Sequence, residues 1–159
     1  MDRLWAPWRM KFIEAKKDKK CIFCLAARQQ KKYRVVLKTK YSLALLNAFP
    51  YNNGHMMICP LRHVSSLGKL GQAEMLDLIN TLTYTQKMLD KILRPDGYNI
   101  GINTSEASGA GIAAHLHIHI VPRFIGDVNF MPVLYDTKVL PESLDAFYKK
   151  FLNAKSKRN

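Results

Sequence analysis

The sequence predicts an α+β fold, in which a mainly antiparallel sheet of five strands carries one long packed helix and a second helix near the C-terminus. Three observations support this prediction. Short apolar segments recur with turn residues between them, which is typical of antiparallel strands. The stretch 72–93 has the periodicity of a long amphipathic helix. Helices are few and connections are short, which favours an antiparallel sheet over alternating strands and helices.

The first three predicted strands lie in the N-terminal half of the chain. Residues 34–38 and 41–47 predict two short strands joined by a polar turn. Residues 50–54, with the sequence PYNNG, have strong turn chemistry. Residues 55–59 then predict an apolar strand that ends at Pro60.

The long helix is predicted over residues 72–93, and Pro95 ends its pattern. Its large apolar side chains recur at helical spacing, so they should form the face that covers the sheet. The residues expected on this buried face are Met75, Ile79, Leu82, Leu89 and Ile92.

Two more strands and one helix complete the predicted fold. Residues 98–103 predict the fourth strand, and 104–114 are rich in small residues and predict a flexible loop. Residues 115–121 alternate imidazole and apolar side chains, which predicts the fifth strand. A last helix is predicted over residues 142–152.

The chain has 159 residues, of which 48% are hydrophobic and 23% are charged, and this composition suits one globular domain. Within that domain we expect an N-terminal arm (1–20), a core (33–124) and a C-terminal extension (125–159). The arm contains Trp5 and Trp8, and we expect it to pack on the body or on a partner subunit. No apolar run reaches the roughly 20 residues that a membrane helix needs, so no membrane partner is expected.

The net charge is +13, and much of it lies in runs such as residues 16–20 and 155–158. Two interpretations are open: the runs form a solvated surface, or they steer a polyanionic substrate or attract nucleic acid. Residues 1–10 lack the pattern of a signal peptide, and three cysteines, an odd number, fit a reducing compartment. We therefore expect a cytoplasmic protein.

Three of the five histidines lie in the segment 115–121. On a strand the three imidazoles would point to one face, while the apolar residues between them point into the core. The other two, His55 and His63, lie in a second short segment, where we expect His55 to be a structural, hydrogen-bonded histidine. Imidazole changes its charge near neutral pH, so this concentration on one face predicts a functional site.

The histidine segment is suited to phosphoryl or nucleotidyl transfer. His117 has a histidine on either side and is the candidate nucleophile. Its other ring nitrogen needs a fixed acceptor, and a backbone carbonyl is the candidate because the segment has no acidic residue. His119 can donate a hydrogen bond to a phosphate oxygen. Gly109 and Gly111 would let backbone N–H groups approach a phosphate closely.

The pattern His-φ-His-φ-His-φ-φ, in which φ is apolar, resembles the signature of the histidine triad (HIT) family of nucleotide hydrolases and transferases. The resemblance covers nearly the whole chain and implies a HIT-like fold and a homodimer. Segments 41–47 and 54–64 resemble the two preceding strands of the family. Segments 4–10, 126–134 and 141–144 resemble one branch, the bacterial diadenosine tetraphosphate phosphorylases.

The resemblance also implies roles for individual residues. His117 would attack the α-phosphate and form a covalent nucleotidyl-histidine, and His119 would bind phosphate oxygens. Asn47 would contact the ribose hydroxyls, although an asparagine at this place can also simply form a turn. Many relatives carry Gln or Asn where this chain has Thr104, and the shorter hydroxyl would reach less far toward the phosphates. The residues expected to bind the substrate are Asn47, Asn103, Thr104 and Gly111.

Cys21 and Cys24 have the C-x₂-C spacing of a zinc-binding segment, and the chain has no second pair with this spacing. Zinc-bearing members of the family use histidines at the positions of His63 and His115. The resemblance therefore implies a closed Cys₂His₂ zinc site with a structural role. The alternative is that the two cysteines are reduced thiols without a metal.

The sequence thus predicts an enzyme that cleaves a dinucleoside polyphosphate through a histidine-bound nucleotidyl intermediate. With inorganic phosphate as acceptor, the reaction converts diadenosine tetraphosphate to ADP and ATP; with water, it is a hydrolysis. The branch segments favour phosphorolysis. One alternative is a hydrolase of purine nucleoside phosphoramidates or dinucleoside polyphosphates. Another is a non-catalytic nucleotide- or nucleic-acid-binding protein, although nucleic acid is not the expected partner.

Overall fold

The structure is a computed structural model that describes residues 21–127 and 140–156. The predicted arm with Trp5 and Trp8 lies outside the described residues. So do segment 4–10 and all but the first two residues of segment 126–134.

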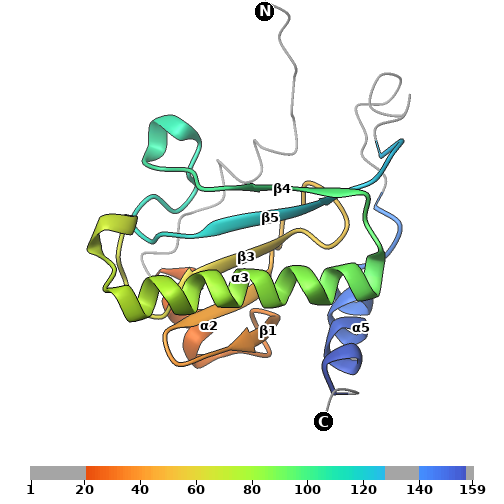
Figure 1. Cartoon of the computed structure of the whole chain (residues 1–159), viewed down its shortest axis with the longest axis horizontal. Coiled ribbons are helices and arrows are strands. Elements are labelled where there is room, and N and C mark those ends of the chain that lie inside the picture. Colours follow the sequence, from red (N-terminus) through yellow and green to blue (C-terminus); the bar gives the residue numbers. More distant parts are fainter. Residues whose placement is uncertain (1–20, 128–139, 157–159) are drawn as a thin grey trace, which may run out of the picture.

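A five-stranded antiparallel sheet lies at the centre of the fold, in the spatial order β1-β2-β3-β5-β4 (Figure 1). The predicted α+β class and its antiparallel sheet are therefore confirmed. The strands are β1 (Val35–Lys38), β2 (Ser42–Leu46), β3 (Met56–Pro60), β4 (Gly97–Gly101) and β5 (Ile118–Arg123).

Three α-helices occur among the described residues: α2 (Ile22–Arg28), α3 (Gln72–Leu93) and α5 (Leu144–Ser156). Two short 3₁₀ turns, η1 (Leu67–Lys69) and η2 (Glu106–Ser108), lie in the connections. Helix α3 has the predicted bounds and runs across the sheet in Figure 1. Helix α5 starts two residues later than predicted, because the Ser143 hydroxyl accepts the Ala146 N–H and caps the helix.

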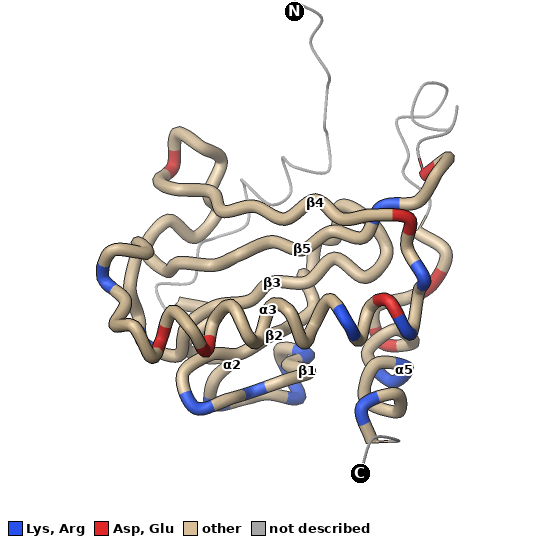
Figure 2. The backbone as a smooth tube through the Cα atoms, in the orientation of Figure 1, with Lys and Arg blue, Asp and Glu red and all other residues tan. Residues whose placement is uncertain are grey.

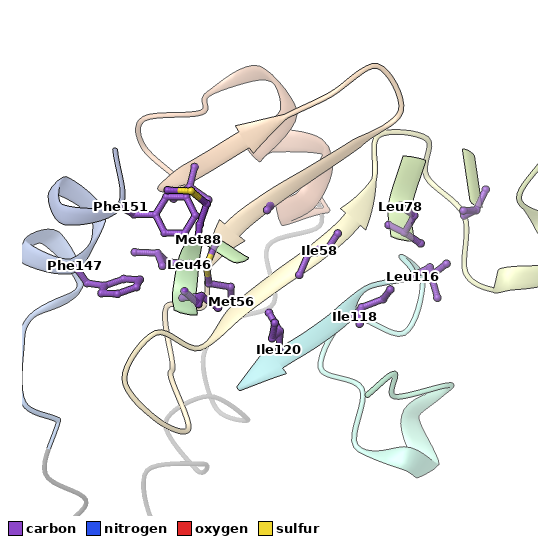
Figure 3. Packing of buried hydrophobic residues seen from close by; sticks show 14 residues of the cluster. Leu46, Met56, Ile58, Leu78, Met88, Leu116, Ile118, Ile120, Phe147 and Phe151 are labelled. Carbon is purple, nitrogen blue, oxygen red and sulfur yellow. The ribbon is translucent and has the colours of Figure 1, made fainter. Parts of the chain in front are cut away.

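Hydrophobic clusters lie on both faces of the sheet. The larger cluster joins the sheet to α3 and α5 and includes Leu116, Ile118 and Ile120 (Figure 3). The smaller cluster joins the other face to α2 through Phe23. Strands β2 and β3 are buried along their whole length because both of their faces are covered. Since the apolar residues of the histidine segment face α3, its imidazoles face the side of α2.

The buried face of α3 differs from the predicted one in its first half. Ile79 is 45% exposed, whereas its neighbour Leu78 is fully buried. Thr81 and Thr85 lie on the buried face, and the Thr85 hydroxyl donates to the Thr81 carbonyl inside the helix. A search for large apolar residues overlooks such threonines. The Thr85 hydroxyl can be buried because it is bonded within the helix, whereas the Thr81 hydroxyl is buried without a hydrogen-bond partner among the described residues.

The histidine strand begins at Ile118, whereas the sequence pattern predicted that it begins at His115. Residues 111–114 form turns, and the first two histidines lie in the short segment that leads into β5. The strand also continues through Pro122, which pairs with Tyr98 of β4. The ladder to β3 ends at Ile120, so the missing N–H of Pro122 interrupts no bond on that side.

Basic residues are unevenly distributed over the described chain. Figure 2 shows lysine and arginine gathered along the α2–β1 segment and along α5. Residues 28–40 contain six basic and no acidic residues. Within residues 21–127 and 140–156, no helix combines the length and the apolar character that crossing a membrane requires.

Candidate active site and metal centre

The five histidines of the chain gather on the α2 side of the sheet. The ring centroids of His117 and His119 lie 4.9 Å apart, and those of His55 and His119 lie 5.1 Å apart. At the other end, the rings of His63 and His115 meet edge to face at 5.0 Å. The structure therefore joins the two separate histidine segments of the sequence into one site.

His117 is held in a single tautomer. Its Nδ1 lies 2.9 Å from the backbone carbonyl oxygen of His115. A carbonyl only accepts, so Nδ1 carries the proton and Nε2 keeps its lone pair. The ring is 5% exposed, and burial lowers its pKa, against the hydrogen bond to the carbonyl, which raises it. A neutral imidazole with a free Nε2 lone pair is suited to nucleophilic attack on phosphorus.

His119 is oriented by His55, which the sequence analysis expected to be a structural residue. The Tyr51 N–H donates to Nδ1 of His55 at 3.0 Å, so the proton of His55 is on Nε2. That Nε2–H donates to Nδ1 of His119 at 2.9 Å. The proton of neutral His119 is therefore on Nε2. Burial and, to a lesser extent, nearby His117 lower the pKa of His119 to about 4, so His119 is a neutral N–H donor at pH 7.

The loop that precedes β3 is fixed at several points. Gly54 has φ +75°, which favours glycine, and a side chain there would meet Leu93 of α3 at 2.5 Å. Asn52 is buried, and its amide donates to the Pro122 carbonyl at 3.0 Å and to the Asp127 carboxylate at 2.8 Å. Asp127 is in turn paired with Arg123 at 2.7 Å. These contacts place His55 beside the end of the histidine strand.

Asn47 lies at the start of the same loop. Its side-chain oxygen accepts the Phe49 N–H at 2.9 Å, which is the hydrogen bond of an Asx turn. Its amide nitrogen lies 3.3 Å and 3.4 Å from the two ring nitrogens of His55. The turn-forming alternative for Asn47 is therefore present in the structure. The side chain is also next to the histidine site, as a ribose contact would require.

The other predicted substrate-binding residues lie in the loop between β4 and β5. Gly101 pairs with His119, so the chain leaves β4 in the direction of His117, and Asn103 and Thr104 follow directly. Gly111 lies in the turns just before His115. Ser105 has φ +70°, a conformation that non-glycine residues rarely adopt and that is often found at functional sites.

The four predicted metal ligands lie together. The ligand atoms of Cys21, Cys24, His63 and His115 are all within 4.8 Å of one another. Nδ1 of His115 lies 3.2 Å from Sγ of Cys21 and 3.8 Å from Sγ of Cys24, and Nδ1 of His63 lies 3.4 Å from Sγ of Cys24. Ligand atoms of a tetrahedral zinc ion are separated by about 3.3–3.8 Å. This set of donors therefore fits zinc.

The second nitrogen of His115 supports this fit. Nε2 lies 2.9 Å from the Pro60 carbonyl oxygen and must donate to it, which leaves Nδ1 unprotonated and directed at the two thiols. Burial lowers the pKa of His115 to about 4, and the neighbouring rings of His63 and His117 add to this. A neutral histidine with a fixed tautomer is the form that binds a metal.

Three contributions could not be found in the sequence. Tyr51 packs on His55, with ring centroids 4.6 Å apart. Phe23 contacts the rings of His115 and His117, at 5.1 Å and 4.9 Å. The bond between Asn52 and Asp127 spans 75 residues. For the placement of His55 beside these residues, the sequence held one local indication, which is Gly54-His55 after a turn. A glycine that must adopt positive φ fixes the backbone of the residue that follows it.

The comparisons with known proteins agree with this geometry. A family model described as HIT domain matches residues 28–126. An AP-4-A phosphorylase from Mycobacterium tuberculosis is 35% identical over 157 aligned residues, which cover 91% of this chain and 79% of that protein. A protein named bis(5'-nucleosyl)-tetraphosphatase (asymmetrical), from Schizosaccharomyces pombe, is 31% identical and covers 64% of this chain and 56% of its own length.

Among solved structures, a zinc-bound histidine triad family protein from Mycobacterium smegmatis has a TM-score of 0.69 at 20% identity. The match covers 87% of this chain and 94% of the other. A HIT-like protein from Bartonella henselae also has a TM-score of 0.69, at 23% identity, over 86% of this chain and 97% of the other. At 20% and 23% identity, the similarity to these two structures supports the fold of this chain and no statement about its function.

Proposed function

The chain belongs to the HIT domain family, and from that premise we propose that it is a single-domain enzyme that cleaves dinucleoside polyphosphates through a covalent nucleotidyl-histidine. The observation that carries this proposal is the tautomer of His117, whose Nδ1–H is bound to the His115 carbonyl. The preferred acceptor is inorganic phosphate. The 35% identical Mycobacterium tuberculosis protein, named AP-4-A phosphorylase, supports this choice.

In the first step, Nε2 of His117 attacks the α-phosphorus of diadenosine tetraphosphate. An N–P bond forms, the bond from that phosphorus to the bridging oxygen breaks, and ATP leaves with the electron pair. The imidazole acquires positive charge, which the His115 carbonyl stabilises through the Nδ1–H. In the second step a phosphate oxygen attacks the same phosphorus. The N–P bond breaks, ADP forms and His117 is neutral again.

The remaining site residues bind and orient the substrate. Nε2–H of His119, held outward by His55, donates to a non-bridging phosphate oxygen as negative charge develops. The amide of Asn47 contacts the ribose hydroxyls, and the loop of Asn103, Thr104 and Gly111 binds phosphate oxygens. The support for these roles is the position of each residue beside the histidines.

We further propose that Cys21, Cys24, His63 and His115 hold a zinc ion with a structural role. All four positions would be taken by protein atoms, so the ion would join α2 to the histidine segment without a place for substrate. When bound, zinc would supply a fixed crosslink that withdraws the His115 ring from the reaction. The support is the spacing of the donor atoms and the Nε2–H of His115 on the Pro60 carbonyl.

We also propose that the protein is a cytoplasmic homodimer. The three cysteines, all within the described residues, are unbridged, as expected in a reducing compartment. Strand β4 lies at one edge of the sheet, and residues 99–101 are exposed there, including Ile100. An exposed strand edge can pair with a second copy of the chain.

The deciding experiment is to incubate the purified protein with diadenosine tetraphosphate, with and without inorganic phosphate. Phosphorolysis predicts ADP and ATP and a rate that depends on phosphate. Equal rates with AMP as product would establish a hydrolase instead. The variant H117N should lose turnover but still bind nucleotide, because asparagine keeps a polar side chain but cannot form the covalent intermediate. Wild-type turnover by H117N would contradict the mechanism.

A further inference from the structure

Two large aromatic side chains are exposed beside the histidines. Phe49 is 55% exposed and Tyr51 is 51% exposed, and both lie in the loop between β2 and β3. Large apolar rings that stay exposed next to a polar site often mark a surface that a ligand covers. Tyr51 has ring contacts to two of the histidines.

The half-exposed ring of Tyr51 lies beside the row of largely buried imidazoles. Its centroid lies 4.6 Å from that of His55 and 6.0 Å from that of His119, and it is inclined by 30° to the His119 ring. His117 lies on the other side of His119, at 4.9 Å. The ring of Tyr51 therefore lies 6.0 Å from the histidine that is proposed to bind phosphate, in the same loop as Asn47.

The backbone of Tyr51 is fixed before any ligand binds. Its N–H donates to His55, and the adjacent Asn52 is bonded to the Pro122 carbonyl and to Asp127. On the other side, Asn53 donates to Glu142 at 2.9 Å. An aromatic ring on a loop tied at these points loses little conformational entropy when a ligand packs against it.

We propose that Tyr51 is a binding residue whose ring packs against the nucleoside joined to the phosphate at His119. This inference rests on the proposed function, because it takes His119 as the phosphate contact. It assigns to Tyr51 the discrimination between nucleotides and simple phosphates. A nucleobase or ribose offers an apolar face that covers the exposed ring, whereas an inorganic phosphate or pyrophosphate offers none.

The test compares two ligands that differ in the nucleoside, AMP and inorganic pyrophosphate, by calorimetric titration of the full-length protein. Stacking between a base and an aromatic ring contributes enough that its removal weakens binding by roughly fivefold or more. We expect Y51A to raise the Kd of AMP relative to that of pyrophosphate by about that factor. The variants Y51F and Y51W should keep the wild-type ratio, because both retain an aromatic face.

The matched control is I125A, which removes another exposed apolar side chain, 90% exposed, and should leave the ratio unchanged. If Y51A weakens both ligands equally, Tyr51 only positions the histidines and the inference is wrong. It is also wrong if Y51A changes neither affinity. The titration measures binding without turnover. If the protein failed to cleave dinucleoside polyphosphates, the proposed function would be wrong, but the effect of Y51A on the two Kd values could still be interpreted.

Discussion

Nε2 of His55 lies 2.9 Å from Nδ1 of His119, although 64 residues separate the two histidines. The Tyr51 N–H occupies the other nitrogen of His55, so the direction of this hydrogen bond is fixed. A backbone amide thereby decides where the proton of His119 resides. His55 acts on the reaction through His119, and its importance can be measured separately from that of the nucleophile.

Replacing His55 with alanine should lower kcat by about 10- to 100-fold, because His119 would no longer be held as an Nε2–H donor. The variant H55Q should retain more activity, since the glutamine amide can still donate to Nδ1 of His119. The measurement is kcat and KM for diadenosine tetraphosphate, together with the thermal melting temperature. If H55A and H55Q lost the same amount of activity, and both also had a lower melting temperature, His55 would have only a structural role.

The pH dependence should reflect the low pKa of His119. Burial lowers this pKa to about 4, so the ring stays neutral as the pH falls from 8 to about 5 and gains a proton only below that. Burial also lowers the pKa of the nucleophile His117, so we expect kcat/KM to decrease only at a pH below the value near 6.5 at which a free imidazole gains its proton. An acid limb centred near 6.5, the value of a free imidazole, would contradict the burial seen in the structure.

The same shift predicts a change in stability with pH. The unfolded chain binds a proton on His119 below about pH 6.5, whereas the folded His119 binds it only near pH 4. The free energy of unfolding should therefore decrease as the pH falls through this window. Chemical denaturation at pH 7 and pH 5 would measure it, and the change should be smaller in a variant that lacks His119.

The purified protein should contain about one zinc ion per chain. The variant H63A should lose most of it and melt at a lower temperature, because metal binding stabilises the folded state. Metal analysis after dialysis would measure the content. C59A is the matched control: Cys59 is buried, burial raises the pKa of its thiol, and it is not among the four clustered ligands, so its removal should leave the zinc in place. An unchanged zinc content in H63A would disprove the assigned ligand set.

Substituting Gly54 with alanine should destabilise the fold by about 1–3 kcal/mol, because positive φ is unfavourable for alanine and its Cβ would meet Leu93. Gly68 provides the control, since a Cβ there would meet nothing within 4 Å. We expect G68A to change the free energy of unfolding by less than about 0.5 kcal/mol. Urea denaturation of both variants measures the difference, and equal effects would show that Gly54 has no special conformational requirement.

The elements of the fold were predicted well where the sequence pattern is local. The period of two in β5 and the helical period of α3 depend on neighbouring residues alone, and these elements were found with small errors at their ends. The buried face of α3 was wrong at Ile79, because which side of a helix meets the sheet depends on contacts with distant strands. The start of β5 was also misplaced, because the N–H groups of His115 and Leu116 donate to the carbonyls of Ile112 and Val64 and not to a neighbouring strand.

For the site, the histidine pattern predicts His117 as the nucleophile, and this stays a prediction. The C-x₂-C pair together with the family resemblance predicted four metal ligands, and these four residues lie clustered in the structure. The expected backbone acceptor for His117 was found as the carbonyl of His115. The role of His55 was missed, because a lone histidine after a glycine carries no sign of its partner. Contacts such as that between Tyr51 and His119 depend on how two segments meet in space, and no spacing along the chain encodes them.

His115 offers its ring to the cysteines and its backbone oxygen to His117, so one residue contacts both the proposed metal site and the proposed nucleophile. The two duties use different atoms and are separable. A related chain without the metal ligands would keep the catalytic activity if other contacts held the His115 carbonyl in the same position. Conversely, oxidation of the two thiols would change the contacts on one side of the His115 ring, without modifying any atom that is proposed to touch the substrate.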